Sequence, residues 1–229
     1  MRRFDAVIFD FDGVLVDSEL ISLSELNRSL EAFGIGKSWE ALVDGFLGHS
    51  NSAIAEYIEQ HSGQNPGIEF PERWAKRIFE RFATDLTLIP GTMDLLGTLD
   101  AEAIPYCIAS GSSPDRLQYS LDLVGLDGCF RDKAYSCDLV AKGKPAPDIF
   151  FYAADKLGVS PRNCLVIEDG IAGTVGAKAA EIDHIIGFVG GSHLLGCEDS
   201  HAAKLTKSGA SHIVRTLAEI ETMLSATPA

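Results

Sequence analysis

The sequence predicts an α/β protein with a parallel sheet covered by helices on both faces and an all-helical insertion after the first strand. From Pro90 onward, short apolar runs alternate with stretches of helical periodicity, which is the pattern of strands joined by crossover helices. Between residues 16 and 87, by contrast, helical repeats follow one another without a convincing strand. We therefore expect a core domain formed by residues 1–15 and 88–229 and a cap domain formed by residues 16–87.

The first strand is expected at residues 4–9, an apolar run that ends in the acidic stretch DFDG. The first helix of the insertion is predicted by Leu23, Leu26 and Leu30, which recur at spacings of three and four. Gly34 should end it, because glycine adopts the left-handed conformation that closes many helices. Further helices of the insertion are expected at residues 38–47, 52–60 and 71–86.

The second half of the chain supplies the remaining elements in alternation. Strands are expected at residues 106–109, 164–167, 185–189 and 213–214. Helices are expected at residues 114–124, 149–157 and 217–224. Open parallel sheets bind their ligands outside the carboxyl ends of the strands, so that edge is where a site is expected. Hinges between the two domains should lie near residues 14–17 and 87–91.

The composition limits the classes of partner. The 229 residues carry a formal net charge of −14 with no basic stripe, which argues against nucleic-acid binding. No apolar run reaches the length of a membrane span, so no membrane partner is expected. The five cysteines form no C-x-x-C pair and no signal peptide precedes the first strand, a pattern typical of reduced thiols in the cytoplasm. We expect a monomer or a weak homodimer.

Charged and hydroxyl side chains stand at the expected carboxyl ends of the strands. Asp10 and Asp12 follow the first strand, and residues two apart on an extended backbone point to the same side. Ser110 opens the stretch SGSSPD after the second strand, and Glu168 and Asp169 follow the strand at residues 164–167. Carboxylates this crowded need a cation or a shared proton. Mg²⁺ suits such oxygen ligands and commonly also holds a substrate phosphate.

A phosphate would also find neutral and positive partners at this edge. Lys144, in the loop KGKPAPDIF, offers a point charge, and Ser110 offers a hydroxyl donor. The combination predicts phosphoryl transfer. One aspartate would attack phosphorus as a nucleophile, and the other would act as general acid and then base.

The stretches DFDGVLVDS, ASGSS, GKPAPDIF and IEDG resemble, in order and spacing, the four motifs of the haloacid dehalogenase-like superfamily. The resemblance covers nearly the whole chain and is to the phosphatase and phosphomutase branch, in which a helical cap follows the first motif. It implies a Rossmann-like core, Mg²⁺ as cofactor and Asp10 as the nucleophile that forms an aspartyl-phosphate. Asp12 would be the acid/base, with its backbone carbonyl also on Mg²⁺. Ser110, Gly111 and Lys144 would bind the phosphate. The metal ligands implied are Asp10, Asp12, Glu168 and Asp169.

Within this family the stretches DSELISLSEL and QYSLDLVGL resemble phosphatases of small sugar phosphates. A small phosphorylated metabolite, such as a sugar phosphate or sugar-acid phosphate, is thus the expected substrate. Specificity should come from the cap at His49, Ser50 and Asn51. Trp39 and Trp74 are expected in the core of the cap.

The alternative is a phosphosugar mutase of the β-phosphoglucomutase type. Such a mutase places an arginine where Asn51 stands and a histidine where Ser22 stands. Both departures favour hydrolysis, since they remove groups suited to a second phosphate or to proton transfer. A cation for a second phosphate is still available from Arg28, Arg73, Lys76 or Arg77.

Two other readings have less support. Hydrolytic dehalogenation would not need Asp12, because a halide leaving group needs no proton. A non-catalytic binding protein would not need a nucleophile beside an acid. Two local features stay open: the family has a glycine where Glu181 stands, and the expected loop FVGGSH at residues 188–193 has no assigned role.

Overall fold

The computed structural model describes residues 4–47 and 51–225. Its centre is a six-stranded sheet with the order β3-β2-β1-β4-β5-β6, and every adjacent pair is parallel. The strands are β1 Ala6–Phe9, β2 Tyr106–Ser110, β3 Ala134–Ser136, β4 Cys164–Glu168, β5 His184–Phe188 and β6 His212–Val214. The expected α/β class is confirmed, and the acidic ends of β1 and β4 are neighbours because these two strands pair.

Successive side chains along a strand point alternately into two hydrophobic clusters, one on each face of the sheet, as the pleat of a strand requires. Ala6 and Ile8 point into one cluster of buried residues, and Val7 and Phe9 point into the other. The helices on the first side are α8 Asp148–Leu157, α9 Ile171–Ala179 and α10 Glu198–Ser208. The helices on the second side are α5 Thr92–Ala101, α6 Pro114–Val124, α7 Asp127–Phe130 and α11 Leu217–Ser225. The described residues also include the short 3₁₀ turns η1 Cys137–Leu139, η2 Pro161–Asn163 and η3 Ser192–Leu194.

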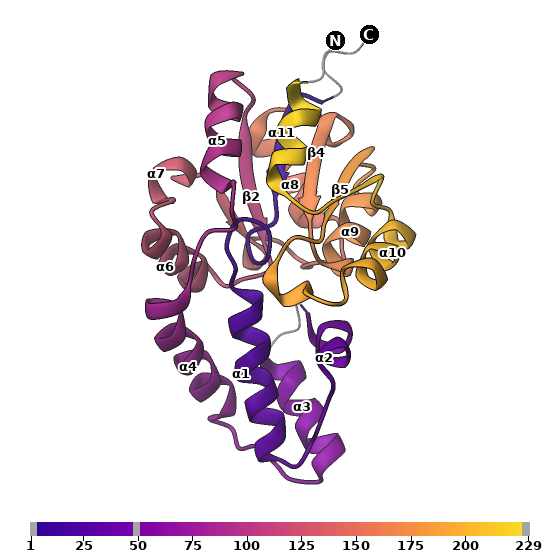
Figure 1. The fold of residues 1–229 in the computed structure, drawn as a ribbon. Coiled ribbons are helices and arrows are strands. Elements are labelled where there is room, and N and C mark those ends of the chain that lie inside the picture. Colours follow the sequence, from indigo (N-terminus) through magenta and orange to yellow (C-terminus); the bar gives the residue numbers. More distant parts are fainter. Residues whose placement is uncertain (1–3, 48–50, 226–229) are drawn as a thin grey trace.

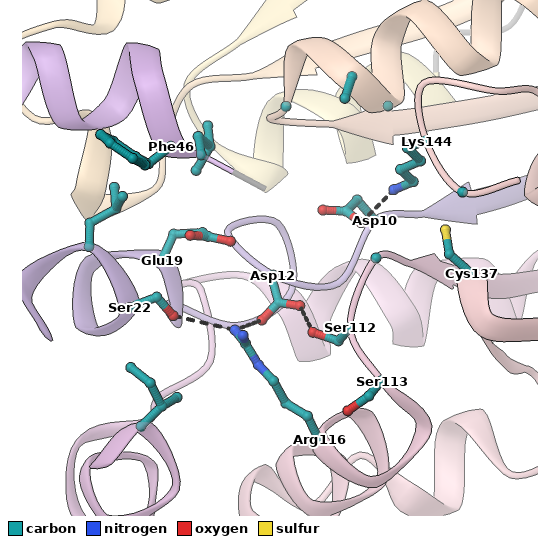
Figure 2. Close-up of a pocket in the computed structure, with 18 of the residues that line it drawn as sticks. Asp10, Asp12, Glu19, Ser22, Phe46, Ser112, Ser113, Arg116, Cys137 and Lys144 are labelled. Atoms are coloured by element: carbon teal, nitrogen blue, oxygen red, sulfur yellow. Dashed lines mark hydrogen bonds and ion pairs between the residues drawn. The ribbon is translucent and has the colours of Figure 1, made fainter. Parts of the chain in front are cut away.

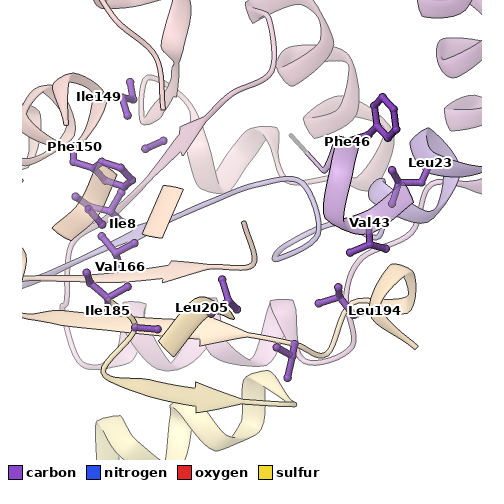
Figure 3. Packing of buried hydrophobic residues seen from close by; sticks show 14 of the residues in the cluster. Ile8, Leu23, Val43, Phe46, Ile149, Phe150, Val166, Ile185, Leu194 and Leu205 are labelled. Carbon is purple, nitrogen blue, oxygen red and sulfur yellow. The ribbon is translucent and has the colours of Figure 1, made fainter. Parts of the chain in front are cut away.

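Four helices lie between β1 and the second half of the chain, where the insertion is expected. They are α1 Glu19–Ala32, α2 Trp39–Phe46, α3 Asn51–Ser62 and α4 Phe70–Asp85. Figure 1 shows them gathered at the bottom of the molecule, beyond the end of the sheet toward which the arrow of β4 points. Their apolar side chains continue the cluster that contains Ile8, and Figure 3 shows members from both parts of the molecule. Gly34, at φ 73°, closes α1 as expected, with the Ile35 N–H donating to the Leu30 carbonyl at 3.0 Å.

Helices α1 and α4 are joined by an ion pair on a buried carboxylate. Glu25 of α1 is 1% exposed, and its carboxylate lies 2.9 Å from the partly exposed Arg81 guanidinium of α4. Arg28, also on α1, lies 3.0 Å from the same carboxylate. A buried charge needs such partners, and the contact with Arg81 links α4 to α1.

The two segments that connect the helices to the sheet pair with each other. Val16 and Leu88 form an isolated antiparallel bridge. The Asp17 N–H donates to the Thr87 carbonyl at 2.9 Å, and the Ile89 N–H donates to the Leu15 carbonyl at 3.0 Å. The expected hinges therefore lie side by side, and motion about them stays a prediction.

Several elements carry too weak a sequence pattern to be expected at defined positions. Strand β3 has only three residues, at the edge of the sheet. Helix α10 is mainly polar and buries just His201 and Leu205. Helix α9 is rich in glycine and small residues, so its apolar periodicity is faint.

The turn at Glu181 keeps the backbone that a glycine would adopt. Glu181 has φ 61°. Its N–H donates to the Lys178 carbonyl at 3.1 Å, and the Ile182 N–H donates to the Ala177 carbonyl at 3.2 Å. These two hydrogen bonds form the Schellman closure of α9, which favours glycine at the left-handed position. The turn that the sequence left uncertain is thus formed. Glu181 adopts in it a left-handed backbone conformation, which is unfavourable for a residue with a side chain.

We expect Glu181→Gly to unfold with a free energy about 1 kcal/mol higher than Glu181→Ala, because the left-handed conformation costs a non-glycine residue about 1–2 kcal/mol and glycine recovers most of it. The alanine variant is the matched control, since both changes remove the exposed ion pair with Arg162. Chemical denaturation measures the difference. Equal stability of the two variants would mean that the turn is not strained.

Candidate active site

A pocket of about 450 Å³ lies between the carboxyl edge of the sheet and helices α1 to α4. The sheet side brings charged groups from several segments: Asp10, Asp12, Arg116, Lys144, Glu168 and Asp169. Figure 2 shows part of this pocket, with Asp10 beside Lys144 and Asp12 between Arg116 and Ser112. The parallel pairing of β1 with β4 places Asp10 and Asp12 beside Glu168 and Asp169, as the sequence predicts.

Asp10 shares a lysine with Glu168. Its backbone N–H donates to the Ile167 carbonyl at 2.9 Å, which fixes it at the end of β1 against β4. The Lys144 ammonium lies 2.7 Å from Asp10 Oδ1 and also donates to Glu168 Oε1. Burial and the charge of Glu168 raise the pKa of Asp10 to about 7, although Lys144 opposes the shift. The single positive charge of Lys144 therefore does not neutralise the carboxylates around it.

The acidic cluster consists of Asp10, Glu168 and Asp169, whose ligand oxygens all lie within 4.8 Å of one another. Burial and Asp10 raise the pKa of Asp169 well above its ordinary value. Asp169 Oδ2 is buried, and the ring Nε2 of His193 lies 3.1 Å from it. Three largely buried carboxylates this close together form a donor set that fits a hard divalent cation such as Mg²⁺.

Asp12 has a different environment from Asp10. It accepts hydrogen bonds from Ser18 and Ser112, each at 2.6 Å, and from Arg116 at 2.9 Å. Burial raises the pKa of Asp12, but Arg116 and the two hydroxyls outweigh it, so the net pKa is lowered. The pKa values of the two aspartates, two residues apart, are therefore shifted in opposite directions.

The residues expected to bind phosphate differ in how deeply they are buried beneath the pocket surface. Lys144 and Gly111 line the pocket. Ser110 is fully buried; its hydroxyl accepts the Ser112 N–H at 3.0 Å and lies 3.5 Å from Asp12 Oδ2. Two further serines of this loop line the pocket: Ser112 is buried and donates its hydroxyl to Asp12, whereas Ser113 is exposed.

The specificity residues expected in the cap cannot be placed. His49 and Ser50 lie outside the described residues, and Asn51 begins α3 without a described side chain. Trp74 is buried as expected, and it also lines the pocket. Trp39 donates its indole N–H to the backbone carbonyl of His193 at 2.8 Å.

Arg116 and Glu19 are site residues that the sequence analysis missed. Arg116 also lies 3.3 Å from Ser22, the position where the mutases carry a histidine. A weak signal exists: Arg116 stands in the first turn of α6, directly after the loop that follows β2. Glu19 lines the pocket at the start of α1, and burial together with Asp12 raises the pKa of Glu19 to about 8.

The loop without an assigned role reaches the acidic cluster from behind. His193, fully buried, places Nε2 3.1 Å from Asp169 Oδ2. The neighbouring Ser192 donates from its backbone N–H, at 3.2 Å, and from its hydroxyl to the Asp17 carboxylate in the connector. One short segment thus contacts a cluster carboxylate, a connector and, through Trp39, helix α2.

Gly13 leaves room for this arrangement. Its φ is +77°, and a Cβ built on it would lie 1.9 Å from Asp169 Oδ2. No side chain fits there unless Asp169 moves. The glycine that follows the two aspartates is therefore required by a close approach as well as by a turn.

A parallel α/β sheet with a buried acidic cluster and a lysine at its carboxyl edge is the arrangement of a phosphate-handling hydrolase. The family model of haloacid dehalogenase-like hydrolases matches residues 4–181, and the chain belongs to this family. Over 174 residues it is 29% identical to the 6-phosphogluconate phosphatase of Escherichia coli (strain K12), covering 76% of this chain and 77% of that protein.

Among the solved structures that match along nearly the whole chain, two show the similarity well. One is a conserved haloacid dehalogenase-like protein of unknown function from Agrobacterium tumefaciens, with a TM-score of 0.84, 35% identity and coverage of 97% and 98%. The other is a HAD family hydrolase from Deinococcus radiodurans with bound phosphate and sodium, with a TM-score of 0.79, 31% identity and coverage of 99% of each chain. Among the described residues, no helix has the length and apolar character needed to cross a membrane.

We expect Gly13→Ala to lower kcat/KM about 100-fold, since displacing a site carboxylate by about 1 Å has effects of that order. The matched control is Gly34→Ala, at φ +73° with nothing within 4 Å of the added Cβ. Both variants place alanine in the left-handed region and lose that much stability, and Gly13→Ala adds the clash with Asp169. Activity assays and denaturation separate the two effects. Equal activities of the two variants would remove the steric role assigned to Gly13.

Proposed function

We propose that this protein is a Mg²⁺-dependent phosphatase that hydrolyses a small phosphorylated metabolite through an aspartyl-phosphate on Asp10. The observation that carries the proposal is the position of Asp10: it lines the pocket within an acidic cluster and beside Lys144. The phosphatase name of the Escherichia coli relative and the phosphate bound in the Deinococcus structure support the same chemistry.

The proposed metal site uses the carboxylates of Asp10, Glu168 and Asp169. Asp12 would add its backbone carbonyl, since its carboxylate is already bound to Arg116, Ser18 and Ser112. When bound, Mg²⁺ would supply the positive charge that allows these carboxylates and a phosphate to share one site.

In the first proposed step, an Asp10 oxygen attacks phosphorus and the bond to the leaving oxygen breaks. The Asp12 carboxyl gives its proton to that oxygen. Asp12 must first gain the proton despite Arg116, and the negative charge of an approaching phosphate raises its pKa in the required direction. Lys144 would stabilise the charge on the phosphoryl oxygens.

In the second proposed step, water attacks the phosphorus of the aspartyl-phosphate. Asp12, now a carboxylate, takes the proton from water, and the bond between phosphorus and Asp10 breaks. Inorganic phosphate leaves, and both carboxyl groups return to their initial states. The hydrogen bonds of Asp12 favour the anion, which suits the base in this step.

We further propose that helices α1 to α4, with residues 16–87, act as a cap that opens and closes about the paired connectors. Closure would exclude bulk water until the leaving group departs. The bridge between Val16 and Leu88 gives the two connectors a common axis. Ser192 donates to Asp17, and the Trp39 indole N–H donates to the His193 carbonyl. These contacts between the insertion and the core would stabilise the observed position of the cap.

Hydrolysis has more support than the mutase alternative. A bisphosphate would need a second cation in the pocket, and the four candidates of the helical insertion are absent from the lining that the structure describes. Arg28 and Arg77 approach Glu25, Arg73 approaches Glu69, and Lys76 approaches Glu80. Sugar and sugar-acid phosphates belong in the panel of metabolites to assay, as the name of the Escherichia coli relative suggests.

We expect Asp10→Asn to lower turnover of phosphate monoesters at least about 100-fold, because an amide cannot replace the carboxylate nucleophile. Asp5→Asn is the matched control: Asp5 precedes β1 at the opposite end and binds Asn163 at 2.7 Å. Release of inorganic phosphate with excess Mg²⁺ measures activity, and circular dichroism checks the fold. An Asp10→Asn enzyme with more than about a hundredth of wild-type turnover would contradict a covalent step on Asp10.

A further inference from the structure

We infer that the group esterified to the phosphate of the substrate carries an aromatic ring that contacts the helices of the insertion. The inference rests on the proposed function and specifies the substrate of the same site. Its basis is the contrast between the two sides of the pocket: charged at the edge of the sheet and apolar across from it.

The apolar side is formed by side chains from α1 to α4. We use "apolar wall" for Leu26, Phe46, Ile54, Trp74, Ile78 and Phe79, all of which line the pocket. From the described residues of the insertion, Glu19 and Ser22 alone add acidic or hydroxyl groups to the lining, and both lie at the start of α1. The pocket therefore becomes less polar with distance from Asp10 and Asp12.

The two cations among the described lining residues are already engaged. Lys144 binds Asp10 and Glu168, and Arg116 binds Asp12. A second phosphate or a carboxylate on the substrate would be desolvated against the apolar wall without a partner, which is strongly unfavourable. The Trp74 indole N–H is buried without a partner among the described residues and could serve one oxygen there, but the several hydroxyls of a bare polyol would still lack partners against the wall, and buried donors and acceptors need them.

A substrate whose alcohol is polar near the phosphate and ends in an uncharged ring matches both ends of the pocket. Next to the phosphate, Glu19 and Ser22 can serve a hydroxyl or ether oxygen of the substrate. Farther away, Phe46, Trp74 and Phe79 offer aromatic contacts, and the aliphatic members of the wall offer dispersion contacts. The expected substrate is thus a phosphate monoester that is polar near the phosphate and aromatic beyond it.

The first test compares phosphate esters whose leaving groups have similar intrinsic reactivity. We expect kcat/KM for 2-phenylethyl phosphate to exceed that for glucitol 6-phosphate and for 6-phosphogluconate by at least about tenfold, since all three are primary alkyl esters and differ in how they contact the wall. A preference for either polyol ester would overturn the inference and leave the proposed phosphatase intact. If none of the three esters is hydrolysed in the presence of Mg²⁺, the proposed function is contradicted, and the inference with it.

The second test changes the wall itself. Phe79 is half-buried, and its ring contacts Tyr119 with centroids 5.0 Å apart. Phe79→Asn should lower the ratio of kcat/KM for 2-phenylethyl phosphate to that for ethyl phosphate about tenfold, whereas the apolar Phe79→Leu should retain most of it. Leu123→Asn, on the exposed face of α6 outside the pocket, is the control and should keep the wild-type ratio. An unchanged ratio in Phe79→Asn would contradict contact between the ring and the wall.

Discussion

The repulsion among buried carboxylates at one edge of the sheet is the constraint on which the site depends. Asp10, Glu168 and Asp169 are held within 4.8 Å of one another by the direct pairing of β1 with β4. Lys144 offsets part of this charge, and the pKa of Asp10 still rises to about 7. Such a cluster is unfavourable for folding alone, so its presence is best explained by a cation and an anionic substrate that use it.

The surrounding structure keeps the cluster in place and keeps Asp12 separate from it. Arg116, Ser18 and Ser112 bind the Asp12 carboxylate, and this gives two neighbouring aspartates different chemistry. Behind the cluster, Gly13 allows Asp169 to approach, and His193 lies against it. The segment carrying His193 also contacts the connector and α2. The position of the helical insertion and the position of a cluster carboxylate are therefore linked by direct contacts.

The parts of the site that the sequence predicted are those set by strand ends. Asp10, Glu168 and Asp169 follow apolar runs, and a parallel sheet brings such positions together. Arg116 and His193 were missed because their roles depend on how a helix and a long loop pack, which no local pattern records. Strand β3 was too short to detect, and the apolar wall depends on how four helices face the sheet. Glu181 illustrates a further limit of prediction from sequence: the turn forms in the folded protein although the usual glycine is missing.

The central claim is that the buried carboxylates hold protons that a divalent cation must displace. It is tested most directly by calorimetric titration of Mg²⁺ into the metal-free protein, near pH 6 and near pH 8, in buffers with different ionisation enthalpies. A raised pKa means that the folded protein binds protons below about pH 7 that cation binding releases. The account predicts proton release and weaker Mg²⁺ binding near pH 6, with both effects smaller near pH 8. Binding with the same affinity and without proton release at both pH values would contradict it.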